Sequence, residues 1–180
     1  DLMLIHQPFN DYYGTYRAME DALKAGKLRA IGISNFYPDR LIDLCKFVEI
    51  KPAVNQVETH VFQQQKEAHE IMTKYGVQHE SWGPFAEGRK DFFNNRTVQK
   101  IGEKYGKTAA QTALRFLIQS DVVVIPKSTH KNRMEENFNV FDFTLSEEEM
   151  AVLAKLDENE SAFFSHYSPS TVESLTDLVI

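Results

Sequence analysis

Short apolar runs alternate with helix-patterned segments along the whole of this chain, and each run ends in a polar or aromatic residue. The five ends are His6, Ser34-Asn35, Gln56, Trp82 and Lys127-Ser128. Strict alternation of strands and helices predicts a parallel sheet that is covered by helices. In a barrel of this kind, the carboxyl ends of the strands converge on the face that carries the active site. We therefore expect the functional residues of this chain to lie at these five ends.

The predicted strands cover residues 2–5, 28–33, 52–57, 77–82 and 122–125. The first of them is uniformly apolar, which predicts a strand that is buried on both faces. Helices are expected at 16–25, from Pro38 onward, and at 63–75, 98–105, 109–118, 133–137 and from Ser146 onward. Thr108 is a candidate N-cap, and Ser146 with Glu149 reads as a capping box. Residues 83–95 are predicted to form a loop.

The pattern predicts a single α/β domain over residues 1–180, and two architectures compete for it. One is a doubly wound open sheet, and the other is a partial (β/α)8 TIM barrel of about five strand-helix units with parallel strands. Neither G-x-G-x-x-G nor G-x-x-x-x-G-K-[ST] occurs, which weakens the nucleotide-binding open sheet. The chain has 180 residues, whereas a complete barrel typically has about 250. We therefore expect the amino-terminal part of the barrel to be missing from this sequence.

Bulk properties exclude several classes of function. The formal net charge of -6 argues against nonspecific binding to nucleic acid or to an anionic membrane surface. No apolar run approaches the roughly 18 to 20 residues that cross a bilayer, and the first residues do not read as a secretory signal. Cys45 is the only cysteine, so it cannot form an internal disulfide, which favours a reducing cytoplasm.

Four polar residues at the ends of the first three strands can carry chemistry. His6 precedes Gln7 and can donate a hydrogen bond to a carbonyl oxygen or move a proton near neutral pH. The side chains of Ser34, Asn35 and Gln56 can pair with a carboxamide, which presents both a donor and an acceptor. The alternatives are a structural histidine bonded to backbone and ordinary turn chemistry at Ser34 and Asn35.

Trp82 is the only tryptophan, and it stands beside Gly83 at the end of the fourth predicted strand. An aromatic face at that place can stack on a flat heterocycle. A core or rim aromatic residue is the alternative.

Lys127, Ser128, Thr129 and Arg133 follow the fifth predicted strand and precede a helix. Cationic side chains and hydroxyl groups beside a helix N-terminus are what a phosphate group needs, because charge-assisted bonds and free backbone amides meet there. Barrels often place phosphate sites after their last two strands. A solvated surface cluster is the alternative. The remaining histidines show no metal-ligand spacing, so no metal site is predicted.

Taken together, these stretches resemble the aldo-keto reductase family over nearly the whole chain. The matching segments are Leu4-Ile5-His6-Gln7-Pro8, residues 26–36 (GKLRAIGISNF), residues 52–58 (PAVNQVE), and Ile125-Pro126-Lys127-Ser128 with Arg133, Glu136 and Asn137. The sequence looks most like the bacterial branch that reduces small carbonyl compounds, including diketogluconate reductase-like members.

The resemblance implies a (β/α)8 barrel that transfers hydride from NADPH to an aldehyde or ketone. By motif match, His6 is the active-site histidine that orients and polarises the substrate carbonyl. The implied cofactor-binding residues are Ser34, Asn35 and Gln56 for the nicotinamide carboxamide, Trp82 for the nicotinamide ring, Lys127, Ser128, Thr129 and Arg133 for the 2′-phosphate, and Glu136 and Asn137 for adenine. Gly83, which follows Trp82, is also counted among the cofactor-binding residues. A fixed nicotinamide and a polarised carbonyl supply proximity and charge stabilisation together.

The sequence also departs from the family pattern. The proton-donating tyrosine of the family, its lysine and aspartate partners, and three of the eight strands are expected upstream of residue 1. Gln7 replaces a tryptophan that many members carry, and Tyr167 stands where a basic residue is common, which bears on substrate preference. We therefore expect this chain alone to be weakly active or inactive.

Two other interpretations stay open. The first is a noncatalytic NADPH-binding or assembly module derived from the same fold, because five strands leave two sheet edges open and favour self-association. The second is that an amino-terminal third of the protein precedes this sequence. The expected partner in the main interpretation is a small-molecule carbonyl substrate, with no nucleic acid and no membrane.

Overall fold

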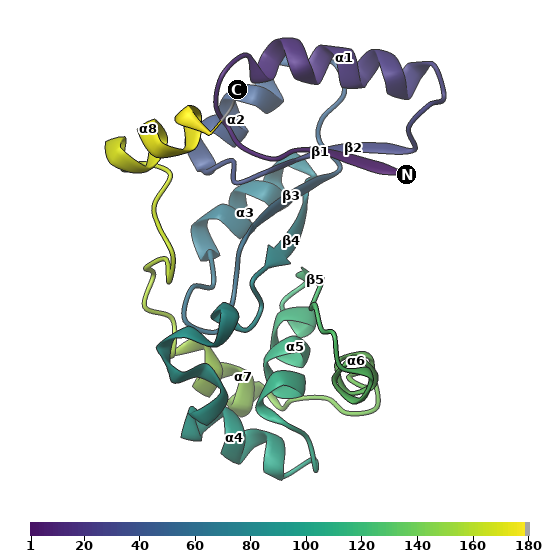
Figure 1. Ribbon diagram of the computed structural model, residues 1–180. Coiled ribbons are helices and arrows are strands. Elements are labelled where there is room, and N and C mark those ends of the chain that lie inside the picture. Colours follow the sequence, from purple (N-terminus) through teal and green to yellow (C-terminus); the bar gives the residue numbers. More distant parts are fainter. Residues whose placement is uncertain (179–180) are drawn as a thin grey trace. The chain divides into compact units, whose positions relative to one another are not determined.

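The computed structural model describes residues 1–178, in which strands and helices alternate along the chain (Figure 1). Five strands form one sheet in the order β1-β2-β3-β4-β5. They are β1 (Leu2–Ile5), β2 (Ala30–Ser34), β3 (Val54–Glu58), β4 (Gln78–Trp82) and β5 (Val123–Val124). The pairs β1–β2, β2–β3 and β4–β5 are parallel, and the sheet is not closed. The predicted alternation and parallel pairing are thus confirmed.

Most of the predicted helices are present, with shifted ends. They are α1 (Tyr12–Lys24), α2 (Pro38–Phe47), α3 (Lys66–Tyr75), α4 (Arg96–Glu103), α5 (Ala109–Gln119), α6 (Lys131–Phe138), α7 (Glu147–Ala154) and α8 (Pro169–Asp177). Both capping predictions are confirmed, because Thr108 with Gln111 and Ser146 with Glu149 form capping boxes. Helix α1 begins earlier than expected, since the Asp11 carboxylate accepts a hydrogen bond from the Gly14 amide at 2.8 Å. Helix α8 was not predicted.

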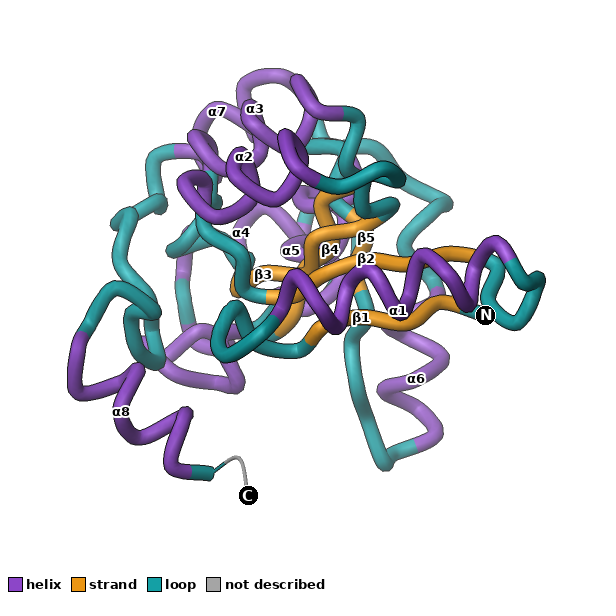
Figure 2. Tube along the Cα trace, turned by 90° about the horizontal axis from the view of Figure 1, so that it is seen from above, coloured by secondary structure: helices purple, strands orange, loops and turns teal. Residues whose placement is uncertain are grey.

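The described residues group into two compact units. The first unit contains residues 1–57, 66–79 and 163–178. Within it, α1 lies along β1 and β2, and α2 packs against α3 (Figure 2). The core is made of apolar side chains from these elements, among them Tyr16, Ile31, Ile33, Phe36, Leu41, Leu44 and Met72.

The prediction that the first strand is buried on both faces is wrong. Leu2 is 41% exposed and Met3 is 50% exposed, while only Ile5 of this strand is buried. The physical reason is position, because β1 is the first strand in the sheet order and has β2 as its one neighbour. An apolar run reports the burial of a strand only when both of its neighbours are present.

The second unit contains residues 58–65 and 80–162. Its core surrounds α5, which packs against α4, α6 and β5, and it includes Phe92, Val98, Leu114, Leu117 and Leu153. The predicted loop 83–95 contains a short 3-10 segment, η1 (Ala86–Asn94), which is interrupted by residues in the left-handed region of φ. Strand β5 is shorter than the predicted run 122–125.

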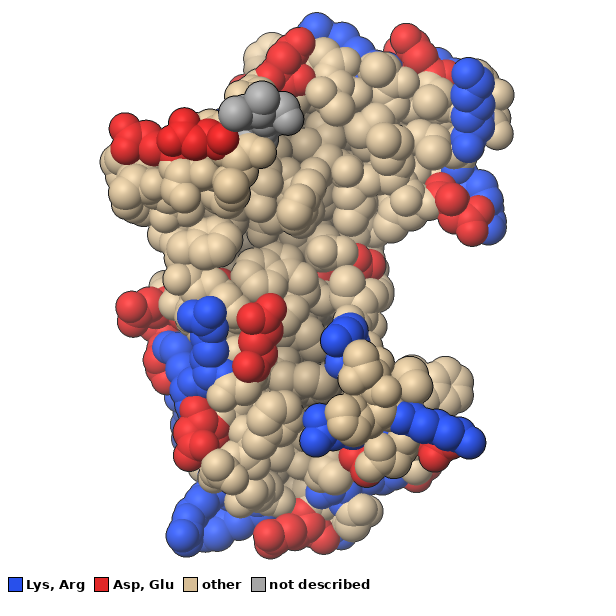
Figure 3. Space-filling view, viewed as in Figure 1, with Lys and Arg blue, Asp and Glu red and all other residues tan. Residues whose placement is uncertain are grey.

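Charged side chains of both signs are interspersed on the face drawn in Figure 3. Within residues 1–178, no helix has both the length and the apolar character needed to cross a bilayer. The single-domain organisation stays a prediction.

Candidate cofactor and substrate site

In the first unit, hydrogen bonds connect the predicted site residues at the ends of β1, β2 and β3. The Ser34 hydroxyl donates to the carbonyl oxygen of Gln56 at 2.8 Å, and the Asn35 amide donates to the same oxygen at 2.9 Å. The side-chain amide of Asn35 donates to the carbonyl oxygen of His6 at 3.0 Å. Ser34 and Asn35 are buried, Gln56 is half-buried, and His6 is exposed. Four predicted residues therefore lie at three adjacent strand ends.

Turn chemistry also contributes to this arrangement. Asn35 has φ of 63°, in the left-handed region that asparagine tolerates better than most residues. The side-chain amide of Asn35 also lies 3.1 Å from the Ser34 hydroxyl oxygen and donates to it. Both side chains thus shape the end of β2, and this structural role coexists with a polar surface suited to a carboxamide.

A histidine that was not predicted as a site residue joins the carboxyl-terminal segment to the end of β1. The Nε2 atom of His166 lies 2.8 Å from Oε1 of Gln7, and its Nδ1 atom lies 3.4 Å from the Tyr37 hydroxyl. The neighbouring Tyr167 donates its hydroxyl to Asp39 at 3.1 Å. Burial, and then the Asp39 carboxylate, raises the pKa of Tyr167 to about 12, so this hydroxyl keeps its proton at neutral pH. Separations of more than 120 residues left no local sequence signal for these pairs.

In the second unit, Trp82 and Gly83 end β4. Trp82 is half-buried, and its carbonyl oxygen accepts a hydrogen bond from the Thr59 amide at 3.2 Å. Gly83 has φ of 62°, and its carbonyl oxygen accepts from the Ala86 amide at 2.7 Å, so the chain turns directly after the tryptophan. This turn agrees with a side chain placed at a strand end, while the stacking role of the indole stays a prediction.

A cavity of about 650 Å³ in the second unit brings together five of the predicted cofactor-binding residues. The five are Lys127, Ser128, Arg133, Glu136 and Asn137. Thr129 is the one residue of the predicted phosphate clamp that does not line it, and its hydroxyl instead lies 3.2 Å from Nδ1 of His130. Other walls come from η1 and its flank, from α4, and from the start of α5.

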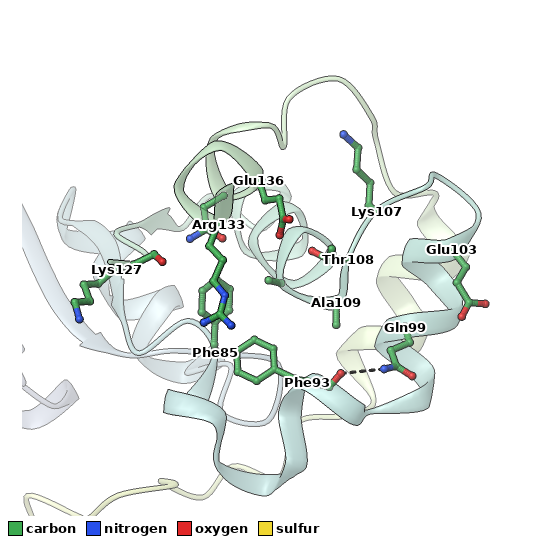
Figure 4. A pocket seen from close by; sticks show the side chains of 13 residues that line it. Phe85, Phe93, Gln99, Glu103, Lys107, Thr108, Ala109, Lys127, Arg133 and Glu136 are labelled. Atoms are coloured by element: carbon green, nitrogen blue, oxygen red, sulfur yellow. Dashed lines mark hydrogen bonds between the residues drawn. The ribbon is translucent and has the colours of Figure 1, made fainter. Parts of the chain in front are cut away.

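Figure 4 shows how the charged and aromatic side chains lie in this cavity. Lys127 lies at one end, and Gln99 and Glu103 lie at the other. Arg133 extends from α6 toward the phenyl rings of Phe85 and Phe93. The two rings were missed as site residues because they belong to the segment read only as a loop.

The two predicted phosphate-binding cations are not held in ion pairs within the part of the chain that the structure describes. Among the described residues, neither Lys127 nor Arg133 forms an ion pair, and both are exposed. By contrast, Lys107, which also lines the cavity, donates to Asp142 at 2.7 Å. Lys127 and Arg133 are therefore available to an anion, as a phosphate site requires.

A buried carboxylate fixes the segment just before the carboxyl-terminal part of the chain. Glu58 is buried at the end of β3 and accepts hydrogen bonds from Nε2 of His60 at 2.9 Å, from the Ala162 amide at 2.8 Å and from the Ser161 hydroxyl. Burial alone would raise the pKa of Glu58, but these hydrogen bonds outweigh it and lower the pKa below its ordinary value. Glu58 is therefore ionised at neutral pH.

The chain is built of strand-helix units with polar residues at the strand ends, and a cationic cavity follows the last strand. These features define a protein of the α/β barrel class with a candidate dinucleotide site. The family model described as "Aldo/keto reductase family" matches residues 1–158. The chain belongs to the aldo/keto reductase family, so the predicted family is confirmed.

Individual relatives agree with this assignment. The chain is 45% identical over 161 residues to the glyoxal reductase of Bacillus subtilis, an alignment that covers 89% of this chain and 58% of the relative. Its fold matches the crystal structure of an aldo-keto reductase from a Medee basin deep-sea metagenome library with a TM-score of 0.89 and 41% identity, over 93% of this chain and 63% of that one. A silkworm (Bombyx mori) aldo-keto reductase, crystallised as a complex with NADPH, matches with a TM-score of 0.85 and 31% identity, over 91% of this chain and 56% of that one.

These comparisons also bear on the fold and the branch. The structural matches confirm the predicted partial barrel, and the chain spans less than two thirds of the length of each relative named above. Glyoxal, in the name of the Bacillus relative, is a small carbonyl compound, as expected for the predicted branch. The roles of the individual site residues, and their convergence on one mouth, stay predictions.

Proposed function

We propose that this chain belongs to an NADPH-dependent oxidoreductase that reduces small aldehydes or ketones to alcohols. The observation that carries the proposal is the cavity in which unpaired Lys127 and Arg133 lie with Ser128, Glu136 and Asn137. Two cations and a hydroxyl group fit a phosphate monoester, and the carboxylate and amide fit the amino and ring nitrogen groups of adenine. Phe85 adds an aromatic wall to the same cavity.

When bound, NADPH would supply the hydride, and the residues of this chain would hold and orient the reactants. Ser34, Asn35 and Gln56 would hold the carboxamide of the nicotinamide, and Trp82 would lie against its ring. His6 would donate a hydrogen bond to the substrate carbonyl oxygen, which stabilises the negative charge that develops there as the carbonyl carbon is reduced. The hydrogen bonds at the ends of β2 and β3 fix the backbone of these residues before any ligand arrives.

We further propose that these 180 residues alone turn over weakly or not at all. No residue here matches the family's proton-donating tyrosine, and the alkoxide formed by hydride transfer needs a proton. The assay is carbonyl-dependent oxidation of NADPH by the purified chain. Robust turnover would contradict the assignment of the proton donor to a tyrosine outside this sequence.

The noncatalytic module remains a second candidate because apolar side chains are exposed on both terminal strands of the sheet order. Leu2 and Met3 on β1, and Val123 on β5, are each more than 40% exposed. Exposed apolar edges favour pairing with another chain. A monomeric state in analytical ultracentrifugation, at concentrations where NADPH binds, would argue against assembly. A cytoplasmic location stays a prediction based on Cys45.

Binding of NADPH tests the main proposal without requiring catalysis. Trp82 is the only tryptophan, so quenching of its fluorescence reports cofactor binding. We expect Lys127→Ala and Arg133→Ala each to weaken NADPH binding roughly 10-fold or more, because each removes a charge-assisted contact to the 2′-phosphate. Binding of NADH, which lacks that phosphate, should change by less than about 2-fold.

Lys131→Ala is the matched control for these variants. Lys131 is an exposed lysine in α6, the helix that also carries Arg133. Its Nζ atom lies 3.7 Å from Oε1 of Glu135, and it does not line the cavity. We expect it to leave NADPH affinity unchanged. Equal losses of NADPH affinity in Lys131→Ala and Lys127→Ala would show a general charge effect and would contradict a built phosphate site.

A further inference from the structure

The imidazole of His166 is fixed on several sides within the first unit. His166 is 8% exposed. The centroid of its ring lies between 5.2 and 6.0 Å from the ring centroids of Phe9, Tyr37 and Phe164. Its backbone amide also donates to the Tyr37 hydroxyl at 3.3 Å. A buried histidine with aromatic walls and polar contacts at both ring nitrogens has one preferred orientation.

These contacts determine which nitrogen of the ring carries the proton. The Oε1 atom of Gln7 can only accept, so Nε2 of His166 donates to it at 2.8 Å. In the neutral ring, Nδ1 is then an acceptor, which matches the Tyr37 hydroxyl 3.4 Å away. The order of donation is therefore Tyr37 to His166 to Gln7.

This order also orients the amide of Gln7. Its oxygen is held by His166, and among residues 1–178 its Nε2 amino group has no hydrogen-bond partner. Gln7 is half-buried and directly follows His6, the predicted substrate-orienting residue. An amino group in this place is a donor that remains available to a ligand.

We propose that His166 is a positioning residue that orients Gln7, so that the Gln7 amino group donates a hydrogen bond to an oxygen of the carbonyl substrate beside His6. This inference deepens the proposed function and rests on it. Without His166, the Gln7 amide would rotate freely, and its donor would be spread over several orientations. The carboxyl-terminal segment thereby acts on substrate recognition through a residue that precedes it by 159 positions.

The test uses the isotope-labelled chain with NADP⁺, which occupies the cofactor site without reducing the ligand. Hydroxyacetone, a small ketone with a second oxygen, is titrated while the side-chain amide resonances of Gln7 are followed by NMR. We expect these resonances to move in the wild type. In His166→Ala and in Tyr37→Phe, we expect affinity for hydroxyacetone to fall about 5-fold, as for the loss of one oriented hydrogen bond.

Three further variants separate positioning from a merely structural role. His166→Gln keeps a donor for Oε1 of Gln7 and should restore affinity to within about 2-fold of the wild type. Gln7→Glu keeps the acceptor for His166 but removes the amino donor, so it should lose affinity as His166→Ala does. Ser170→Ala is the control in the same segment, because it removes an exposed hydroxyl that lies 3.0 Å from the Ser168 hydroxyl and should leave hydroxyacetone binding unchanged.

The outcomes distinguish this inference from the proposed function. If Trp82 fluorescence reports NADPH binding but the Gln7 resonances do not shift when hydroxyacetone is added, the inference is overturned and the proposed function stands. Unchanged hydroxyacetone affinity in Tyr37→Phe and His166→Ala, with the amide spectrum otherwise preserved, would also overturn it. If NADPH does not bind at all, the proposed function fails, and the inference fails with it.

Discussion

The Nδ1 atom of His79 in β4 lies 2.9 Å from the Nδ1 atom of His69 in α3. His79 is 1% exposed, and its burial, followed by the neighbouring His69, lowers its pKa to about 3. One ring must donate its Nδ1 proton while the other accepts it, so a second proton on the accepting ring would break the pair. Because the pKa of His79 is held near 3, its ring is neutral at physiological pH, and the pair can join α3 to β4.

This pair predicts a pH-dependent stability. The pKa of His79 is about 3 in the folded state against 6.5 for an ordinary histidine, so between these values the unfolded chain binds more protons. The contribution of His79 to the free energy of unfolding is fully present above pH 6.5. Below that pH, the contribution decreases by up to about 1.4 kcal/mol per pH unit. Urea denaturation from pH 5 to pH 8 measures this. We expect His79→Leu to flatten the profile and His130→Asn, at an exposed histidine, to leave it unchanged.

Glu58→Gln should destabilise the fold by about 2 to 3 kcal/mol. The change removes a buried charge that accepts three hydrogen bonds, and the new amino group would face one of the groups that donate to Glu58. Glu160→Gln is the control, since Glu160 is exposed and lies beside Ser161 in the same segment. Urea denaturation at pH 7 compares the two. Because the folded pKa of Glu58 is lowered, its contribution should be lost as the pH falls below the ordinary range of a glutamate. Equal stability of both variants would contradict a role for the carboxylate.

Phe85→Ala should weaken NADPH and NADH binding to the same extent, by about 3- to 10-fold, because an aromatic wall contacts the part that both cofactors share. This differs from the expectation for Lys127 and Arg133, which concerns the 2′-phosphate alone. Phe141 is exposed and does not line the cavity, so Phe141→Ala is the matched control. The measurement is again quenching of Trp82 fluorescence, and a loss confined to NADPH would contradict this role for Phe85.

Gly32→Ala should destabilise the sheet by about 1 to 3 kcal/mol. A methyl group at this position in β2 would lie 2.6 Å from Cδ2 of Leu4 and 2.8 Å from the carbonyl oxygen of Val54. The leucine can rotate away, but the carbonyl belongs to the backbone of β3 and moves only with that strand. The double variant with Leu4→Ala should therefore recover little stability in urea denaturation. Full recovery would show that the leucine contact alone was responsible.

Local features of the sequence were sufficient to predict the alternation of elements. Apolar runs located all five strands, and Thr108 and Ser146 marked two helix starts, because a cap is made by residues three positions apart. The clustering of Lys127 with Arg133 was also predictable, since a short loop and one helical turn separate them. Such features need no knowledge of distant parts of the chain.

The features that failed or were missed depend on distant residues. The exposure of Leu2 and Met3 depends on which strands flank β1, and the apolar run carries no information about that. The pairing of Gln7 with His166 joins residues 159 positions apart, and Phe85 becomes a cavity wall only when η1 packs against α5. Tertiary packing determines each of these, so periodicity could not have indicated them.

The bonds that Glu58 receives from Ser161 and Ala162 also limit when the protein can finish folding. The carboxylate leaves the ribosome about 100 residues before its two partners, as the sequence separations of 103 and 104 show. Until residue 162 has emerged, the end of β3 would hold a charge that is only partly solvated by protein groups, so this region should stay open to water during synthesis. Maturation of the second unit is therefore expected to wait until residue 162 has emerged.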